Sequence, residues 1–265
     1  MDFLALKNAL LEAGACRVGF ADLALFPDEE VKAVFRARLR PDATSSLPLA
    51  GVSIAVTLPP DVVAGLGDGP TRAYYDAYHD ANDRLDALAL QCAHELEAAG
   101  FKAWAQTRAQ VAEHDKLNYF VARLPHKTVA TLAGMGWIGK DALLVTKAFG
   151  SAIRITSVLT DAPLPFDAPV TVSHCGTCDA CVKICPAAAL HDVTWRPGVT
   201  STPDLVDVEQ CMKVATELSR RNYGIDYDIC GMCFYVCPFT RKWLRKSLRV
   251  PGAPTSPGYN TAPSP

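Results

Sequence analysis

The chain has 265 residues, of which 49% are hydrophobic, and its formal net charge at pH 7 is −2. This length allows one large domain or two smaller ones with a real hydrophobic core. The small negative charge gives no general reason to expect nucleic acid or an anionic membrane as a partner. No apolar run approaches the ~18 residues of a membrane-spanning helix, and the N-terminus lacks a signal-peptide pattern, so we expect a cytoplasmic protein.

The first 165 residues alternate helix-like and strand-like patterns. Apolar residues at helical spacing predict a helix from residue 3 to Gly14, and a strand follows at 16–20. A second strand is predicted at 52–58, and a long helix from about Thr71 to Ala99. Further strands are predicted at 101–105, 142–146 and 152–160. This alternation indicates a domain that mixes helices with a sheet, of the α/β or α+β class.

Eight of the ten cysteines lie between residues 175 and 237, in two runs. The first run has the spacing C-x2-C-x2-C-x3-C-P, and the second has the same pattern with its first cysteine moved upstream. This spacing is typical of bacterial ferredoxins with two [4Fe–4S] clusters, in which the fourth cysteine of each run ligates the other cluster. One predicted ligand set is therefore Cys175, Cys178, Cys181 and Cys237, and the other is Cys185, Cys211, Cys230 and Cys233.

Disulfides and zinc are the alternatives for these thiols. A C-x2-C-x2-C run packs its thiols too closely for separate disulfides, and nothing else suggests secretion. Zinc sites use pairs of C-x2-C and lack the third cysteine and the C-P ending. The remaining two, Cys16 and Cys92, fall in apolar segments and are predicted to be buried structural thiols. The spacing therefore favours a protein that carries electrons.

A proline-rich linker at 163–172 separates the first region, 1–165, from a cluster module predicted at 170–249. Residues 250–265 are rich in Pro and Ser and are predicted to form a flexible tail. His174, beside the first ligand, is expected to tune a cluster through a hydrogen bond. The basic run 241–249 is interpreted as a solvated helix face, with RNA or an acidic electron donor as alternatives.

A glycine-rich segment, Gly134-Met-Gly-Trp-Ile-Gly-Lys140, precedes the cysteine runs. Glycines let a backbone approach a ligand closely, their amides bind anions, and Lys140 is suited to a phosphate. The spacing fits neither a Walker loop nor a dinucleotide-binding fingerprint. From the residues alone, a structural turn and a ligand-binding loop stay equally open.

This segment resembles the epoxyqueuosine reductase family, which is related to the reductive dehalogenases. The resemblance extends through Leu143–Thr146, Phe149–Ser151, Val158–Asp161 and both cysteine runs. Tyr78-His79 is similar to the family's Asp-Tyr-His segment. The match runs from the N-terminal helix through Pro238. It implies an α+β protein, with a nitroreductase-like, cobalamin-binding α/β domain followed by a ferredoxin-like double-cluster module.

The resemblance also implies a function. Two clusters would pass electrons from an external low-potential donor, of ferredoxin or flavodoxin type, to a cobalamin that reduces a small molecule or a modified nucleoside. His79 and Tyr78 are candidate catalytic residues, with a hydrogen-bonded core histidine as the alternative for His79 and a similar alternative for Tyr78. His126 and Lys127 either contact the anionic tail of the cofactor or face solvent. The expected cofactor-binding residues are Gly134, Gly136, Trp137, Ile138, Gly139 and Lys140.

The chain departs from the family at the catalytic aspartate. The family segment Asp-x-x-Pro-Val-x-Glu corresponds here to 107–113, with Thr107 in the place of the acid, and threonine is no proton donor near neutral pH. Residues 114–127, Asp115 among them, are the place where a replacement acid is expected. Since no helical-repeat extension follows the clusters and the net charge is negative, tRNA is expected to be an unlikely substrate. The alternative function is a ferredoxin-type electron carrier whose first domain docks a partner and binds no corrinoid.

Overall fold

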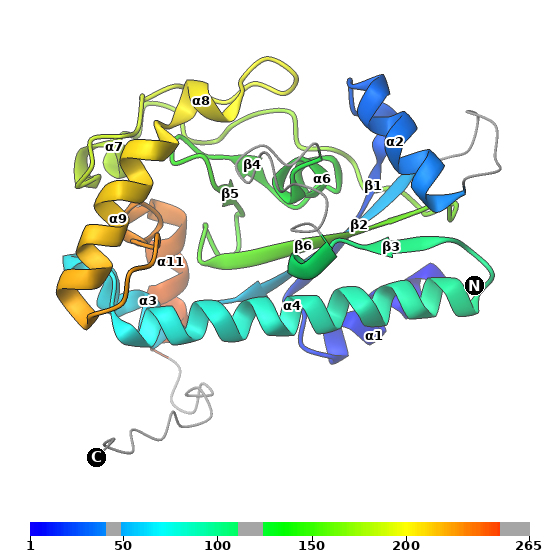
Figure 1. Ribbon diagram of the computed structural model, residues 1–265, viewed down its shortest axis with the longest axis horizontal. Helices are drawn as coiled ribbons and strands as arrows, with labels where there is room; N and C mark the ends of the chain where they lie inside the picture. Colours follow the sequence, from blue (N-terminus) through cyan, green and yellow to red (C-terminus); the bar gives the residue numbers. More distant parts are fainter. Residues whose placement is uncertain (41–48, 111–123, 250–265) are drawn as a thin grey trace.

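The computed structural model describes residues 1–40, 49–110 and 124–249. Its central feature is a four-stranded antiparallel sheet with the strand order β1-β2-β6-β3. The sheet is covered on both faces by helices (Figure 1). The strands are β1 (Arg17–Asp22), β2 (Ala50–Thr57), β3 (Ala103–Ala105) and β6 (Ile153–Thr160). The mixed helix-and-sheet architecture predicted from the sequence is confirmed.

Helices α1 (Phe3–Glu12) and α4 (Arg72–Ala98) cover one face of the sheet. The hydroxyl of Thr71 accepts a hydrogen bond from the Tyr74 amide and so caps the start of α4. Leu85, Leu88 and Cys92 recur at helical spacing and pack in the core against β2 and β6. The long helix, the N-terminal helix and all four strands of this sheet lie where their patterns predicted them.

The other face of the sheet holds a second hydrophobic core. It is built by α2 (Glu29–Leu39), α6 (His126–Leu132) and a short hairpin of β4 (Trp137–Ile138) and β5 (Leu144–Val145). The 3-10 turn η1 (Leu23–Leu25) links β1 to this layer. Helix α3 (Pro60–Ala64) and the turn η2 (Gly65–Asp68) connect β2 to α4.

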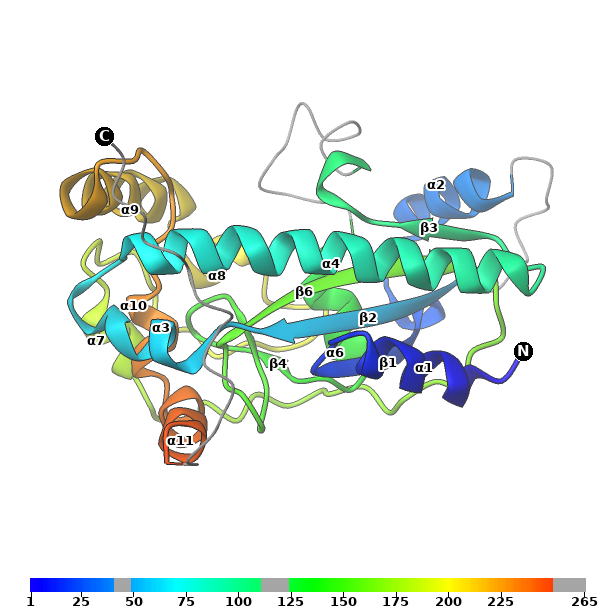
Figure 2. The ribbon, with the colours of Figure 1, turned by 90° about the horizontal axis from the view of Figure 1, so that it is seen from below.

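The cysteine-bearing segment packs at one end of the sheet (Figure 1). In the view of Figure 2, α7 and α10 lie between α9 and α11. Ile229, Phe234 and Trp243 enter the core of the first face, whereas Leu190 and Leu205 enter the second. Its helices are α7 (Ala180–Ile184), α8 (Thr202–Leu205), α9 (Val208–Tyr223), α10 (Met232–Val236) and α11 (Pro238–Ser247).

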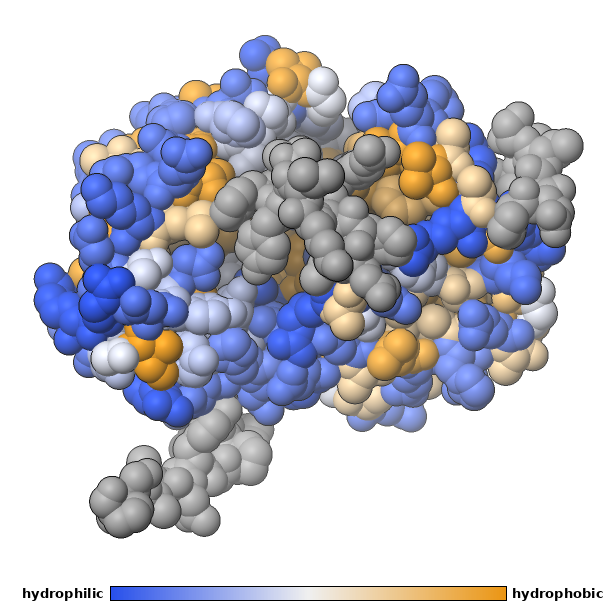
Figure 3. Space-filling model, in the orientation of Figure 1, coloured by the Kyte–Doolittle hydropathy of each residue, from blue (hydrophilic) through white to orange (hydrophobic). Residues whose placement is uncertain are grey.

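The surface is largely polar over α4 and α9 (Figure 3). Across 1–40, 49–110 and 124–249, none of the helices is long and apolar enough to cross a membrane. The domain boundary near residues 165–170 stays a prediction, and the proposed tail, 250–265, lies outside the described residues.

Candidate iron–sulfur site and adjoining pocket

The two cysteine runs fold into two matching short helices. Helix α7 ends at Ile184 with Cys185 as its C-cap, and α10 ends at Val236 with Cys237 as its C-cap, and both cysteines lie outside the helical conformation. A proline follows each, and the residue before a proline is pushed out of the helical conformation. All ten cysteines are free thiols, and the eight predicted ligands are half-buried. Cys92 is buried as predicted, whereas Cys16 is only half-buried.

The first predicted ligand set surrounds one cavity of about 260 Å³, here called the cysteine cavity. Burial raises the pKa of Cys181 to about 12 and that of Cys237 to about 11, and the charge of Cys175 contributes to both shifts. The negative charge of one thiolate disfavours the ionisation of its neighbours, and a bound metal centre that takes thiolate ligands removes this penalty. The cavity is lined by Cys175, Cys178, Cys181 and Cys237, together with Gly139, Lys140, Asp141, Val145, His174, Ala180, Pro238 and Phe239.

The second predicted set also gathers, through α9. Cys211 lies in the first turn of this helix, which brings it back to the second cysteine run. Burial raises the pKa of Cys211 to about 11, with Cys185 and Cys230 as the next causes. Burial likewise raises the pKa of Cys233, to which Asp141, Cys230 and Cys211 add. In the described part of the chain, no three His, Cys, Asp or Glu side chains form a site for a single metal ion. The donors fit two four-iron clusters.

The three glycines of the segment 134–140 pack against the protein itself. A Cβ on Gly136 would lie 2.1 Å from the Val145 carbonyl oxygen, and one on Gly134 would lie 2.6 Å from that of Ala168. Gly134 also has a φ of +66°, in the left-handed region that favours glycine. Gly136 therefore allows the β4–β5 hairpin to close tightly, and Gly134 allows the chain at Ala168 to approach.

The rest of this segment reaches the cysteine cavity. The indole Nε1 of Trp137 donates a hydrogen bond to Cys175 Sγ at 3.4 Å. Lys140 is buried, forms an ion pair with Asp192 at 2.7 Å and lines the cavity with Gly139. His174 packs edge-on against Trp137 beside the same cysteine. Three of the six predicted cofactor-binding residues, Trp137, Gly139 and Lys140, therefore lie against the predicted cluster ligands, and the role of all six in holding a corrinoid stays a prediction.

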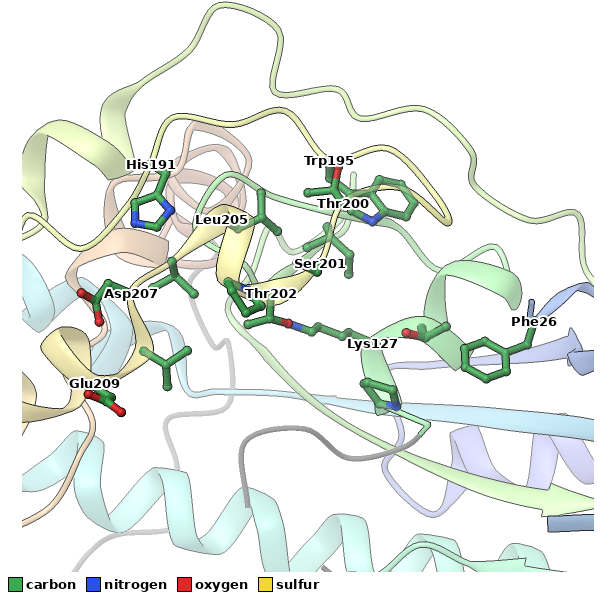
Figure 4. Close-up of a pocket in the computed structure, with 16 residues that line it drawn as sticks. Phe26, Lys127, His191, Trp195, Thr200, Ser201, Thr202, Leu205, Asp207 and Glu209 are labelled. Carbon is green, nitrogen blue, oxygen red and sulfur yellow. The ribbon is translucent and has the colours of Figure 1, made fainter. Parts of the chain in front are cut away.

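A larger pocket of about 740 Å³, here called the Lys127 pocket, opens between α6 and the cluster segment. Lys127 extends toward Thr202, with Phe26 and Trp195 toward one end of the pocket (Figure 4). Its Nζ donates to the Ala142 carbonyl oxygen at 3.1 Å and to Thr202 Oγ1 at 3.0 Å. Burial lowers the pKa of Lys127. Ile138 is the one member of the predicted cofactor-binding set among the residues lining this pocket.

The candidate catalytic residues do not meet at one point. Arg154 on β6 donates to the Tyr78 hydroxyl at 3.1 Å. The His79 ring lies among aromatic rings on α4 and at Tyr227, and its Nε2 is buried without a hydrogen-bond partner in the described structure. The Thr107 hydroxyl accepts from the Gln110 amide at 3.4 Å, so it caps a turn beyond β3. Asp115 and its neighbours in 111–123 lie outside the described residues.

A second buried polar group is centred on His126, for which the sequence analysis left the cofactor tail and solvent as alternatives. His126 Nδ1 lies 2.7 Å from Ser157 Oγ, which also accepts from Gln106 Nε2 at 3.1 Å. Burial, followed by the charge of Arg154, lowers the pKa of His126 to about 4. His126 therefore faces the sheet rather than solvent. The available signal was the pair of polar residues Arg154 and Ser157 within an otherwise strand-like segment.

The α+β fold and its two sets of four cysteines define an iron–sulfur protein of the two-cluster class. Residues 174–240 match the 4Fe-4S double cluster binding domain family, which confirms the two clusters predicted from the spacing. The chain is also similar to epoxyqueuosine reductases, as its glycine segment and cysteine runs indicated. It is 31% identical over 183 residues to that of Pseudomonas aeruginosa, which covers 65% of this chain and 45% of the relative. The chain spans about half the length of the curated relatives it matches.

Solved structures share the fold. An epoxyqueuosine reductase in complex with an epoxyqueuosine-modified tRNA-Tyr stem loop has a TM-score of 0.54 and 19% identity, covering 90% of this chain and 65% of the other. A reductive dehalogenase, described with a mechanism for B12-dependent dehalogenation, has a TM-score of 0.62 and 16% identity, covering 93% of this chain and 34% of the other. The expectation that tRNA is an unlikely substrate was wrong, because the relatives are epoxyqueuosine reductases, one of which is solved with tRNA. Net charge was a poor guide, since it averages over local basic surfaces.

Proposed function

We propose that the chain is an iron–sulfur reductase of the epoxyqueuosine reductase type. Two [4Fe–4S] clusters, held by the two sets of four cysteines in 170–249, carry electrons toward a cobalamin bound by a nitroreductase-like region, 1–165. The substrate is a modified nucleoside within tRNA. The observation that carries the proposal is the convergence of Cys175, Cys178, Cys181 and Cys237 on one cavity, because Cys237 is far in sequence from the other three and all four form one predicted ligand set.

The Lys127 pocket is the proposed site for the cobalamin, in particular its nucleotide tail. Phe26 and Trp195 offer apolar aromatic surface for a benzimidazole base, and Lys127 offers a cation for the phosphate. The pocket lies between the first region and the cluster segment, with Asp207, the N-cap of α9, in its wall. A bound corrinoid would supply a strongly reducing metal centre there, and the protein would supply position and protons.

Tyr78 is the proposed proton donor. Thr107 cannot replace the aspartate of the family, because its hydroxyl has no acidity near neutral pH and already caps a turn. Tyr78 carries a phenol that Arg154 holds at 3.1 Å, and Asn82 in turn accepts from Arg154 at 3.1 Å. The two hydrogen bonds of Arg154 hold the phenol in one orientation, and a general acid must be fixed in position to deliver its proton.

A basic helix supports an RNA substrate. Helix α11 buries Trp243 and Leu244 and turns its cations outward. No acidic residue occurs between 238 and 249, so this face has the local positive charge that phosphate backbones bind. The sequence-based interpretation of this run as an exposed helix face agrees with the structure. The exposed cations are Arg241, Lys242, Arg245, Lys246 and Arg249.

The test is an anaerobic assay of the cobalamin-loaded protein on an epoxyqueuosine-modified tRNA-Tyr stem loop, with a low-potential chemical reductant. Removal of an epoxide oxygen takes two electrons and two protons and releases one water, so mass spectrometry of the nucleoside should show the loss of one oxygen atom. The Cys178→Ala protein is the matched control and should leave the stem loop unchanged. If protein that carries both clusters and cobalamin, all reduced, leaves the epoxyqueuosine of the stem loop unchanged, the proposed substrate is contradicted.

A further inference from the structure

The indole of Trp137 is directed at a predicted cluster ligand. Its Nε1–H donates to Cys175 Sγ at 3.4 Å, and the residue is only 1% exposed. Tryptophan has a single N–H donor and no acceptor, so this bond uses its whole hydrogen-bonding capacity. A buried N–H that found no partner would cost stability. The sulfur of Cys175 is therefore the acceptor that satisfies the buried indole N–H of Trp137.

The surroundings fix the indole in this orientation. His174 and Phe239 pack edge-on against it, with ring centroids 4.8 Å and 5.0 Å away. The backbone of Trp137 pairs with Val145 in the β4–β5 hairpin. Gly136 permits that close pairing, since any side chain there would strike the Val145 carbonyl. The packing of the protein itself therefore fixes the N–H donor toward Cys175 Sγ.

The remainder of the segment 134–140 lies on the same side. Gly139 and Lys140 line the cysteine cavity, and Lys140 is anchored there by Asp192. Of the residues in the segment 134–140, only Ile138 lines the Lys127 pocket. The segment therefore contacts the cluster ligands more extensively than it contacts the pocket assigned to the corrinoid.

We propose that Trp137 is a positioning residue for the iron–sulfur chemistry, and that its hydrogen bond raises the reduction potential of the cluster on Cys175. The inference rests on the ligand sets of the proposed function. Reduction adds one electron to the cluster, from [4Fe–4S]²⁺ to [4Fe–4S]⁺, and breaks no bond. The added negative charge spreads onto the thiolate sulfurs, so an N–H donor to one of them stabilises the reduced state more than the oxidised state.

The experiment is a redox titration of the anaerobic Trp137→Phe protein, followed by electron paramagnetic resonance. Phenylalanine keeps an aromatic ring in the slot and removes the N–H. We expect an unchanged iron content, a lower midpoint potential for one of the two clusters and no shift for the other. Trp104→Phe, on β3 and stacked on Phe35, is the matched control and should shift neither potential. Two unchanged potentials in Trp137→Phe would overturn the inference.

A second measurement tests the same hydrogen bond in the wild-type protein, in case the Trp137→Phe protein does not bind its clusters. In the reduced wild-type protein labelled with ¹⁵N at the indole nitrogens, electron–nuclear double resonance should detect a ¹⁵N coupling to a cluster spin. Absence of that coupling would also overturn the inference. The ligand sets are tested separately: a Cys175→Ser protein that keeps the iron and both potentials of the wild type would show that the ligand assignment, and not Trp137, is at fault.

Discussion

The guanidinium of Arg154 lies over the ring of Tyr78, 4.2 Å from its centroid, while its Nη2 donates to the phenol oxygen at 3.1 Å. The two residues come from β6 and α4, which are far apart in sequence, and Asn82 holds the other side of the guanidinium. This arrangement fixes the phenol by its ring and by its oxygen. It holds one phenolic hydroxyl of the first region in a fixed place, and this is the group that we propose as proton donor in place of the family aspartate, whose position Thr107 is predicted to occupy.

Replacement of Tyr78 by phenylalanine should therefore slow substrate reduction without affecting the clusters. General acids contribute about 10²- to 10⁴-fold to a rate, so we expect a fall of at least about 100-fold under single-turnover conditions. Tyr75→Phe removes a hydroxyl one turn earlier on α4 and is the matched control. A Tyr78→Phe protein that reduces substrate at the wild-type rate would remove Tyr78 from the chemistry.

Removal of one predicted ligand should remove one cluster. In a Cys178→Ala protein the iron content should fall from about eight to about four per chain, because a four-iron cluster requires four thiolates. Cys16→Ala is the control, since this thiol lies outside both ligand sets and should leave the iron content unchanged. Iron and sulfide analysis of both anaerobic proteins is the measurement. Eight irons in Cys178→Ala would contradict the assignment.

Protonation of His126 should destabilise the fold at mildly acidic pH. Its pKa is lowered from 6.5 to about 4 by burial, so the unfolded chain binds the proton more tightly than the folded protein. The stability that this difference gives is complete above the unfolded pKa and is lost as the pH falls from about 6.5 to about 4, at most on the order of 3 kcal/mol.

The His126→Asn protein should lose less stability than the wild type between pH 7 and pH 5. Denaturant midpoints of the anaerobic proteins at both pH values are the measurement. Asp141, whose pKa burial raises to about 6, changes stability in the opposite sense but equally in both proteins. His94→Asn, at an exposed position, serves as control. An equal loss in wild type and His126→Asn would show that His126 is not the responsible group.

The Lys127 pocket should lose affinity for cobalamin when its cation is removed. Lys127→Met retains the aliphatic stem and deletes the ammonium. Loss of one charge-assisted contact of about 1.5 kcal/mol corresponds to roughly tenfold weaker binding. Titration followed by visible absorbance measures the dissociation constant, and Lys147→Met, at an exposed site, is the matched control. Equal affinity in both variants would place the cofactor elsewhere.

The exposed cations of α11 should contribute to RNA binding. The double variant Lys242→Glu/Arg245→Glu reverses two charges on the face that the helix turns to solvent. We expect weaker binding of the tRNA stem loop and a shallower dependence of affinity on salt concentration, because fewer counterions are released. Lys213→Glu, an exposed cation on α9, is the control. An unchanged salt dependence in the double variant would exclude α11 from the RNA-binding surface.

Local patterns in the sequence were sufficient for much of the fold. The apolar spacing of α4 and the strand-like run of β2 depend on neighbouring residues, and their positions were predicted closely. The presence of two four-iron clusters was also predictable, because such clusters require a particular local spacing of cysteines, whereas the division of the cysteines into two ligand sets stays a prediction. Helix α2 was not predicted, although its buried apolar residues, Val31, Phe35 and Leu39, follow helical spacing.

Features that depend on tertiary contacts could not be predicted from local sequence patterns. The glycines of 134–140 left a structural turn and a ligand loop equally open, because no local pattern reveals the close approach of Val145 and Ala168 to these glycines. His126 appeared to be a candidate for the cofactor tail or for solvent, yet β6 supplies Ser157 as its partner. Such pairings depend on which strand lies next to which helix.

The most direct test is to purify the protein without oxygen, measure its iron and sulfide, and titrate it with cobalamin while recording its visible spectrum. The proposed function predicts about eight irons per chain and saturable cobalamin binding with the spectrum of a protein-bound, base-off corrinoid. Eight irons without any cobalamin binding would contradict it, and the protein would then be an electron carrier whose first region serves a different partner.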